Sequence, residues 1–136
     1  MEDCLFCRIC DKKSPSSVVY EDESTLAFLD IMPRAPGHTM VIPKRHCENI
    51  LDLPDGEFLP LFRTVATVTR RIMEVLKPDG FTIGINHGEV SGQVVKHFHI
   101  HVIPRFKDDS GRAVQSVVHN PPAKSLEEIQ AMLKMP

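Results

Sequence analysis

The spacing of apolar positions divides the chain into short strand-like runs and one longer helix-like run. In the first part, apolar and β-branched residues cluster at 18–21, 25–31 and 38–43, separated by the polar break EDES and the proline-rich break MPRAPG. Two further runs of this kind lie at 81–86 and 97–106. Short polar or proline-rich connections favour antiparallel neighbours, because parallel strands need a long crossover. The pattern therefore predicts an antiparallel sheet of five strands.

Between the third and fourth runs the hydrophobic period changes. Apolar residues recur every three or four positions over 58–76, with arginine, glutamate and lysine among the others, which predicts an amphipathic helix. Pro78 and Gly80 end this helix. Its start is open, because Pro54 suits a first turn whereas Pro60 would interrupt a helix that began there.

The C-terminal part differs from the rest in composition. Residues 107–124 are polar and carry proline and glycine, so we expect irregular structure, whereas SLEEIQAMLK at 125–134 predicts a short helix capped by Ser125. The chain as a whole predicts an α+β fold, in which an antiparallel five-stranded sheet packs with one main helix and a short C-terminal helix. We expect one domain over residues 1–136, with 107–136 as a C-terminal extension.

Composition and charge narrow the functional classes. The 136 residues, 42% of them hydrophobic, suffice for one domain with a real core. A formal charge of −2 and a pI near 6.4 argue against a surface that holds a nucleic-acid polymer through its phosphates, although a small nucleotide can bind. No apolar stretch is long enough to span a bilayer, and the first residues, MEDCLFCRICDKK, are acidic and cysteine-rich, unlike a signal peptide. We therefore expect a cytoplasmic protein without a membrane partner.

The run HFHIHVIPRF at 97–106 contains alternating histidines. Successive side chains on a strand point to opposite faces, so His97, His99 and His101 share one face. Such histidines can bind a metal, or they can simply face solvent on a half-exposed strand. A purification tag is a poor explanation, because a tag lacks apolar alternation and lies at a chain end. We expect this face to be turned from the core or to form the wall of a pocket.

Four cysteines suggest metal or redox chemistry. They are Cys4, Cys7, Cys10 and Cys47. In a reducing compartment, CxxC spacing favours a metal or redox site over structural disulfides. A thioredoxin-type motif opens a helix after a buried strand, whereas this one lies at the chain start, so zinc is the better explanation. An iron–sulfur cluster would need four thiolates, and an empty, reduced CxxC is the remaining alternative.

Imidazole chemistry offers a catalytic use for the histidines. Neutral imidazole is nucleophilic near pH 7 and can attack carbonyl or phosphorus centres to form a covalent intermediate. Neighbouring histidines can hold its tautomer and donate hydrogen bonds to a phosphate oxygen or a leaving group. The loop SGQVV at 91–95 adds Gly92 and Gln93 just before the histidines, which by itself is a weak signal.

Together these segments resemble the histidine triad family, whose signature is HxHxHxx with apolar intervening residues. Residues 97–103, HFHIHVI, match it without a break. CLFCRI near the start, VVYEDESTLAFLDIMPRAPGHTMVIPKRH at 18–46 and GINHGEVSGQVVKHFHIHVIPR at 84–105 also look like family segments. The resemblance covers most of the chain and leaves out about the last 30 residues. It implies a nucleotidyl hydrolase or transferase that acts on purine nucleotides through a nucleotidyl-histidine. It also implies that the protein is a homodimer.

The resemblance also assigns roles to individual residues. It implies that His99 is the nucleophile on the α-phosphorus, that His101 and His38 complete the histidine cluster, and that Asp30 binds ribose hydroxyls. The remaining nucleotide-binding positions are the base pocket of Phe6, Ile9, Phe28 and Ile31, and the phosphate-side group of Asn86, Gly92, Gln93 and the backbone around Val94.

Each of these positions also has a purely structural explanation. Phe28 and Ile31 are apolar strand residues that could belong to the core, Asp30 could cap a turn, and His38 could lie on the surface. Val94 departs from the family, because relatives commonly carry serine or threonine there. Valine has no donor for a phosphate oxygen, so this departure bears on the preferred leaving group.

The resemblance also implies a structural zinc site. Its ligands are Cys4, Cys7, His46 and His97, with residues 1–10 as a metal-binding segment. Two thiolates and two imidazoles close a tetrahedron, so no position is left for a water ligand. A catalytic zinc on the triad is the alternative, and Cys10 could replace one ligand or be a plain buried thiol.

The expected reaction is cleavage of a P–N or P–O bond at the α-phosphate. Nucleoside phosphoramidates and adenylates suit the branch that the N-terminal segment resembles, and VKHFHIHVIPRF looks more like the diadenosine polyphosphate hydrolases. A nucleotide-binding regulator or scaffold with little turnover is the third possibility.

Overall fold

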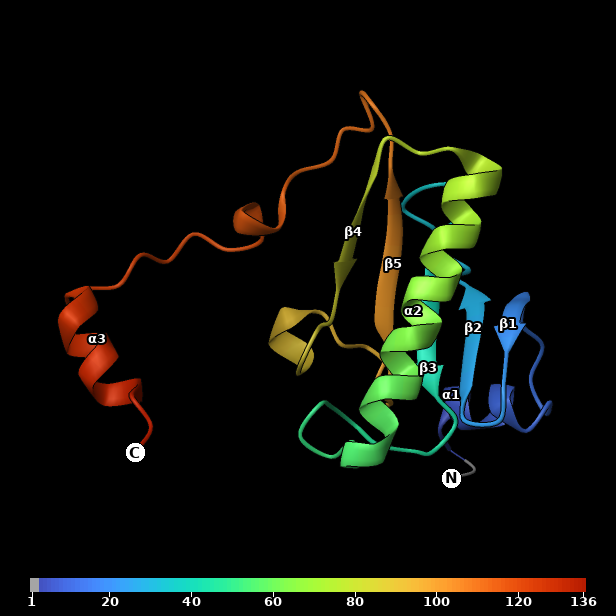
Figure 1. The fold of residues 1–136 in the computed structure, drawn as a ribbon, viewed down its shortest axis with the longest axis horizontal. Coiled ribbons are helices and arrows are strands. Elements are labelled where there is room, and N and C mark those ends of the chain that lie inside the picture. Colours follow the sequence, from blue (N-terminus) through green and yellow to red (C-terminus); the bar gives the residue numbers. More distant parts are fainter. Residues whose placement is uncertain (1–2) are drawn as a thin grey trace.

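The computed structural model describes residues 3–136 and has a five-stranded antiparallel sheet at its centre (Figure 1). The strands are β1 (Val18–Glu21), β2 (Thr25–Leu29), β3 (Thr39–Pro43), β4 (Gly80–Gly84) and β5 (Ile100–Arg105). Their order in the sheet is β1-β2-β3-β5-β4, and all neighbours are antiparallel. The expected α+β fold with an antiparallel five-stranded sheet is confirmed.

The main helix, α2 (Asp55–Leu76), crosses one face of the sheet (Figure 1). Its buried side chains include Leu61, Val65 and Ile72, which recur at helical spacing and pack against the sheet. Pro54 is the residue before the first turn, and Pro60 lies inside the helix without ending it. A proline this near the N-terminus removes only one backbone hydrogen bond, which the packed apolar face outweighs.

A second, smaller helix, α1 (Leu5–Cys10), covers the other face of the sheet near β2 and β3 and belongs to a separate apolar cluster. Phe6 and Ile9 from this helix join Phe28 and Met40 from the strands. The sequence pattern did not predict α1, because six residues are too few to show a helical period. Its N-cap is the thiol of Cys4, which accepts from the Cys7 N–H and is not among the preferred capping residues.

The predicted bounds of β2, β4 and β5 were wrong, and β3 begins at Thr39, one residue later than expected. β2 stops at Leu29, because the carboxylate of Asp30 accepts from the Met32 N–H and turns the chain. β4 spans Gly80–Gly84 and not 81–86. β5 begins at Ile100, so His97 and His99 precede the strand. There the Phe98 N–H donates to the Cys47 carbonyl at 2.7 Å.

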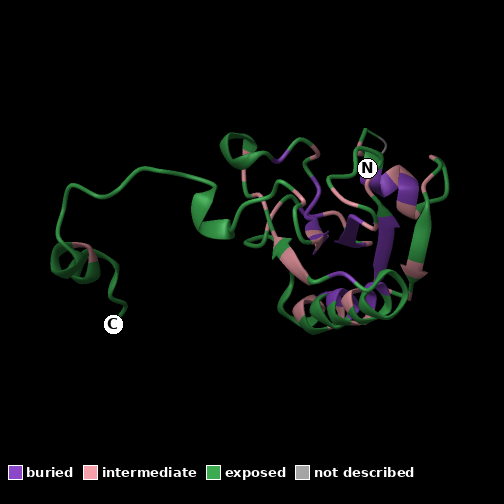
Figure 2. Cartoon of the chain, turned by 90° about the horizontal axis from the view of Figure 1, so that it is seen from above, coloured by how far each residue is buried: buried purple, intermediate pink, exposed green. Residues whose placement is uncertain are grey.

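The C-terminal extension leaves the body of the domain (Figures 1 and 2). Residues 107–124 have no regular structure apart from one short 3-10 turn, η2 (Val114–Ser116), as expected. Helix α3 (Leu126–Leu133) follows, and Ser125 forms a capping box with Glu128, which confirms the predicted cap. Residues 113–136 bury no side chain in this structure. Within residues 3–136, no helix has the length and apolar character needed to cross a bilayer.

Candidate active site and metal centre

The histidines gather on the face of the sheet opposite α2. Phe98, Ile100 and Val102 point into the large apolar cluster under α2, so the intervening His97, His99 and His101 point to the other face. The alternation predicted from the sequence therefore holds, although only His101 lies within β5. The histidines do not simply face solvent: His97 and His99 are 0% and 6% exposed.

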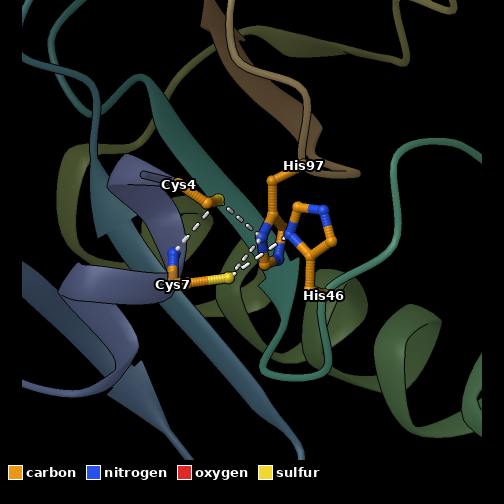
Figure 3. A group of neighbouring side chains, drawn as sticks. All are labelled: Cys4, Cys7, His46 and His97. Atoms are coloured by element: carbon orange, nitrogen blue, oxygen red, sulfur yellow. Dashed lines mark hydrogen bonds between the residues drawn. The ribbon is translucent and has the colours of Figure 1, made fainter. Parts of the chain in front are cut away.

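Four side chains from distant parts of the chain meet at one end of this face (Figure 3). Cys4 and Cys7 come from α1 and its N-cap, His46 from the segment after β3, and His97 from the segment before β5. Their ligand atoms all lie within 4.8 Å of one another. Sγ of Cys4 is 3.4 Å from Nδ1 of His97, and Sγ of Cys7 is 3.3 Å from Nδ1 of His46 and 3.5 Å from Nδ1 of His97.

These distances suit a tetrahedral metal. Zinc at about 2.3 Å from sulfur and about 2.1 Å from nitrogen sets sulfur–nitrogen separations of about 3.6 Å. The second ring nitrogen of His97, Nε2, donates to the Pro43 carbonyl at 2.8 Å. This bond leaves Nδ1 unprotonated toward the cysteines, as a metal-binding imidazole requires. Burial lowers the pKa of His97 to about 4, so the ring is neutral at pH 7.

A second group of possible metal ligands consists of Asp30, His38 and His101. Nε2 of His38 lies 2.9 Å from Nδ1 of His101, which is a hydrogen-bond distance and shorter than the roughly 3.4 Å between two nitrogen ligands of tetrahedral zinc. The first group therefore fits zinc better. Cys10 and Cys47 are in neither group, and burial raises the pKa of each thiol to about 11.

One ring nitrogen of His99 is hydrogen-bonded to the main chain, and the other is available to react. Its Nδ1 lies 2.7 Å from the carbonyl oxygen of His97, which can only accept, so Nδ1 carries the proton. Nε2 is then the unprotonated nitrogen with an available lone pair. The ring of Phe6 lies edge-on at 5.3 Å between centroids and holds the imidazole from the α1 side.

His38 and His101 form a hydrogen-bonded chain with defined tautomers. The Arg34 N–H donates to Nδ1 of His38 at 3.1 Å, so His38 carries its proton on Nε2 and donates it to Nδ1 of His101. His101 then presents an Nε2–H donor. Burial lowers the pKa of His38, and it lowers that of His101 to about 4, so both rings are neutral at pH 7. Asp30 Oδ2 lies 3.5 Å from His38 Nε2.

The expected base-pocket residues differ in how far they are buried. Phe6, Ile9 and Phe28 are buried in the small apolar cluster, and the rings of Phe6 and Phe28 meet edge-on at 5.3 Å. Ile31 is 90% exposed in the turn after β2 and contributes to no buried apolar surface. The first three therefore belong to one buried apolar group beside the histidines, whereas Ile31 is open to solvent.

The phosphate-side loop is held by Gln93. This side chain is buried, and its Nε2 donates to the Glu48 carbonyl at 2.7 Å while its Oε1 accepts from the Gly88 N–H at 2.9 Å. The amide thus fixes the loop. Gly92 has a φ of 111°, which favours glycine, and a Cβ there would lie 3.3 Å from the Asn86 amide nitrogen. Val94 is 90% exposed, so its side chain is open to solvent.

Sequence reasoning missed the main-chain groups that set the tautomers. The carbonyls of Pro43 and His97 and the N–H of Arg34 orient His97, His99 and His38, respectively. No side-chain motif marks such groups, since every residue has a carbonyl.

Comparison with known proteins places the chain in a family. The pattern that defines the HIT domain matches residues 11–108. The chain belongs to the HIT family. This confirms the resemblance seen in the histidine run. Cys4 and Cys7 lie before the matched residues of this chain.

Relatives of this HIT protein include uncharacterized proteins and named enzymes. An uncharacterized HIT-like protein of Methanocaldococcus jannaschii is 47% identical over 109 residues, which are 78% of this chain and 81% of the relative. The adenosine 5'-monophosphoramidase HNT1 of Saccharomyces cerevisiae is 37% identical over 82% of this chain and 68% of its own length. The adenylylsulfatase HINT3 of Arabidopsis thaliana is 35% identical over 85% of this chain and 58% of its own length. These names connect the family with nucleotide hydrolysis.

Solved structures agree with the fold. A HIT family protein from Bacillus subtilis superposes with a TM-score of 0.84 at 39% identity and covers 96% of this chain and 92% of that chain. A zinc-bound histidine triad family protein from Mycobacterium smegmatis has a TM-score of 0.69 at 38% identity, with 80% and 79% covered. A zinc ion therefore occurs in a relative of this HIT domain.

Proposed function

We propose that this HIT domain is a nucleotidyl hydrolase or transferase that cleaves a P–N or P–O bond at the α-phosphate of purine nucleotides. The observation that carries the proposal is the hydrogen bond from Nδ1 of His99 to the His97 carbonyl, which leaves Nε2 free for attack on phosphorus. Nucleoside phosphoramidates and adenylates are the favoured substrates, in line with the names of the yeast and plant relatives.

The first step forms a covalent intermediate. Nε2 of His99 bonds to the α-phosphorus, and the bond from phosphorus to the leaving group breaks with its electron pair on the leaving atom, which takes a proton from water. The His99 ring becomes a cation, which the His97 carbonyl stabilises through Nδ1–H. His101 donates its Nε2–H to a phosphate oxygen, and the His38 N–H holds His101 in that tautomer.

The second step restores the enzyme. A water molecule bonds to phosphorus, the bond to Nε2 breaks and returns its electron pair to His99, and the proton of the water is released. The nucleoside would lie against Phe6 and Phe28, and Asp30 would accept hydrogen bonds from the ribose hydroxyls. Asn86, Gly92 and the backbone around Val94 would line the phosphate side, while Gln93 fixes that loop.

We also propose a structural zinc ion held by Cys4, Cys7, His46 and His97. When bound, zinc would supply a closed tetrahedral link between α1 and the segment before β5. The chain itself positions the ligands and, through Phe6, holds His99 from the same helix. A reducing cytoplasm suits this site, because the four cysteines are free thiols in the structure.

A homodimer is the assembly that we propose. It is supported by β4, which pairs only with β5 among residues 3–136, and by the exposed apolar side chains of the C-terminal extension, among them Leu126 and Leu133. An exposed strand edge and an exposed amphipathic helix are both surfaces that a second copy can cover.

The decisive experiment looks for the nucleotidyl adduct on His99. The protein is mixed with adenosine 5'-phosphoramidate, or separately with diadenosine tetraphosphate, quenched under alkaline denaturing conditions and weighed by intact-protein mass spectrometry. We expect an adenylyl adduct in the wild type and in His119→Ala, whose imidazole is exposed in the extension, and none in His99→Ala. The substrate that gives the faster adduct identifies the branch. Nucleotide binding without adduct or turnover would favour a binding regulator instead.

A further inference from the structure

A hollow of about 230 Å³ lies beyond His101 along β5. The strand carries Ile103 and Arg105 in the same alternation as His101, so they follow it on the histidine face. At about 3.4 Å per residue, Ile103 is about 7 Å past His101, and Arg105 about 14 Å. The residues that line the hollow include Arg34, Thr82, Ile103, Arg105, Asp109 and Arg112.

One arginine of this hollow, Arg105, is neutralised by a carboxylate and holds neighbouring segments together. Arg105 binds the carboxylate of Asp109 through Nε at 2.7 Å and a terminal nitrogen at 3.1 Å. Its other terminal nitrogen donates to Thr82 Oγ1 and to the Arg112 carbonyl, both at 2.9 Å. Arg105 therefore fixes the beginning of the C-terminal extension against the sheet and places Arg112 at the rim.

The other two arginines leave positive charge uncompensated. Arg34 and Arg112 are exposed, and neither guanidinium forms an ion pair with any carboxylate in the part of the chain that the structure describes. With Arg105 balanced by Asp109, the hollow retains the charge of two arginines. A planar guanidinium at such a place binds carboxylate or phosphate through two hydrogen bonds.

Arg34 also connects the hollow with the catalytic histidines. Its main-chain N–H donates to His38 at 3.1 Å, and its side-chain charge is one of the causes, after burial, of the lowered pKa of His38. The apolar group of Phe6 and Phe28 lies on the other side of His99. A nucleotide with its base at the apolar group and its α-phosphorus at His99 would direct its leaving group toward His101 and the arginines.

We propose that the hollow between Arg34 and Arg112 is a leaving-group subsite that selects nucleotide substrates whose leaving group is anionic, as a carboxylate or a phosphate chain is. The proposal rests on nucleotidyl transfer to His99. It gives the C-terminal extension a role in specificity, because Arg112 belongs to its first residues.

The test compares two leaving groups that differ by one charge. The probes are adenosine 5'-phosphoramidates of glycine and of glycinamide, which have the same size and the same P–N bond. We expect the wild type to cleave the glycine probe with the higher kcat/KM. In R34Q/R112Q we expect the ratio of the two kcat/KM values to fall about tenfold, as for the loss of two exposed charge-assisted contacts. Because these contacts are exposed, 0.5 M salt should also reduce the wild-type ratio.

The matched control is R63Q/R70Q. Both arginines are exposed on α2, on the opposite side of the sheet, and the ratio should stay at the wild-type value. Thermal melting checks that all variants fold. Diadenosine tetraphosphate, whose leaving group is ATP, separates the two kinds of anion. A larger loss of kcat/KM in R34Q/R112Q on this substrate assigns the subsite to phosphate chains. A loss of kcat/KM confined to the glycine probe assigns it to carboxylates.

Three results would overturn the proposal. An unchanged ratio in R34Q/R112Q, together with no loss on diadenosine tetraphosphate, would show that the arginines do not contact the leaving group. An equal loss on both phosphoramidates would show a structural effect. In either of these two cases, cleavage of the glycinamide probe by the wild type would still support nucleotidyl transfer to His99. A wild type that forms no adduct with any probe would refute the proposed function, and the subsite with it.

Discussion

The ring of Phe6 lies edge-on to the ring of His99, with 5.3 Å between their centroids. Phe6 stands between Cys4 and Cys7 in the sequence and also contacts the ring of His97 at 5.9 Å. Helix α1, which contains Cys7 and has Cys4 as its N-cap, therefore packs directly on the proposed nucleophile. A change at the metal centre should reach the proposed nucleophile through this aromatic side chain and through the His97 carbonyl, which is hydrogen-bonded to His99.

Metal analysis tests the zinc site. We expect elemental mass spectrometry to find about one zinc per chain in the wild type. The zinc content should fall markedly in C4S/C7S, because oxygen replaces both thiolate ligands. The thermal midpoint of the double variant should fall by several degrees, since metal-binding free energy stabilises the folded state. Cys10→Ser is the control, because Cys10 is outside the ligand group. Zinc that persists in C4S/C7S would place the metal elsewhere, for example on Asp30, His38 and His101.

Truncation of Phe6 tests the coupling between the metal centre and His99. Phe6→Ala should lower the free energy of unfolding by about 3 kcal/mol, as expected for a buried aromatic ring, and should slow adduct formation. Leu5→Ala, at a half-exposed neighbour, should cost less than about 1 kcal/mol and leave adduct formation at the wild-type rate. Urea unfolding and the rate of the adduct measure the two effects. A full rate of adduct formation in Phe6→Ala would contradict a coupling that runs through Phe6.

The tautomers of the histidine chain can be observed directly. Nitrogen-15 NMR of the rings should show His38 and His101 protonated on Nε2, and His99 on Nδ1. His38→Ala should convert His101 to a mixture of tautomers and lower the rate of adduct formation about 10- to 100-fold. His87→Ala, in the exposed loop after β4, should do neither. A single unchanged His101 tautomer in His38→Ala would show that other contacts orient the ring.

Stability should depend on pH through His101. Burial lowers the pKa of this ring to about 4 in the folded state, against about 6.5 in an unfolded chain. The unfolded state therefore binds the extra proton first, and stability falls as the pH drops from about 6.5 toward 4. Between pH 7 and 5 this imidazole alone accounts for a loss on the order of 2 kcal/mol.

Urea unfolding at pH 7 and pH 5 measures this effect in the wild type and in His101→Gln. The variant should lose less stability over this interval, whereas His119→Gln, which changes an exposed ring, should behave as the wild type does. Proton-driven metal release would act on all three proteins alike. Equal losses in wild type and His101→Gln would contradict the lowered pKa.

The assembly can be tested by removing the C-terminal extension. Light scattering should find a dimer for the full chain, and deletion of 113–136 should weaken it while the far-ultraviolet signal of the sheet and α2 remains, because the deleted residues bury no side chain here. A truncated chain that stays fully dimeric would assign the interface to β4. A monomeric full chain would refute the dimer.

The sequence by itself determined the elements whose signals are local. Alternation predicted the five strands, the period of three to four predicted α2, and Ser125 predicted the start of α3. The histidine alternation also put the three triad rings on one face, because side-chain direction along an extended backbone depends only on residue parity. The family resemblance then supplied the four cysteine and histidine positions that the structure brings together.

The tertiary structure decided which atoms of these residues are available. Whether Nδ1 or Nε2 of an imidazole is free depends on which carbonyl or N–H lies opposite, and for His97 that group is Pro43, 54 residues away in the chain. The exposure of Ile31, the late start of β5 and the loop-holding role of Gln93 likewise follow from how distant segments pack. Local periodicity contains no information on such contacts, because they arise only when the sheet, α1 and the loops come together.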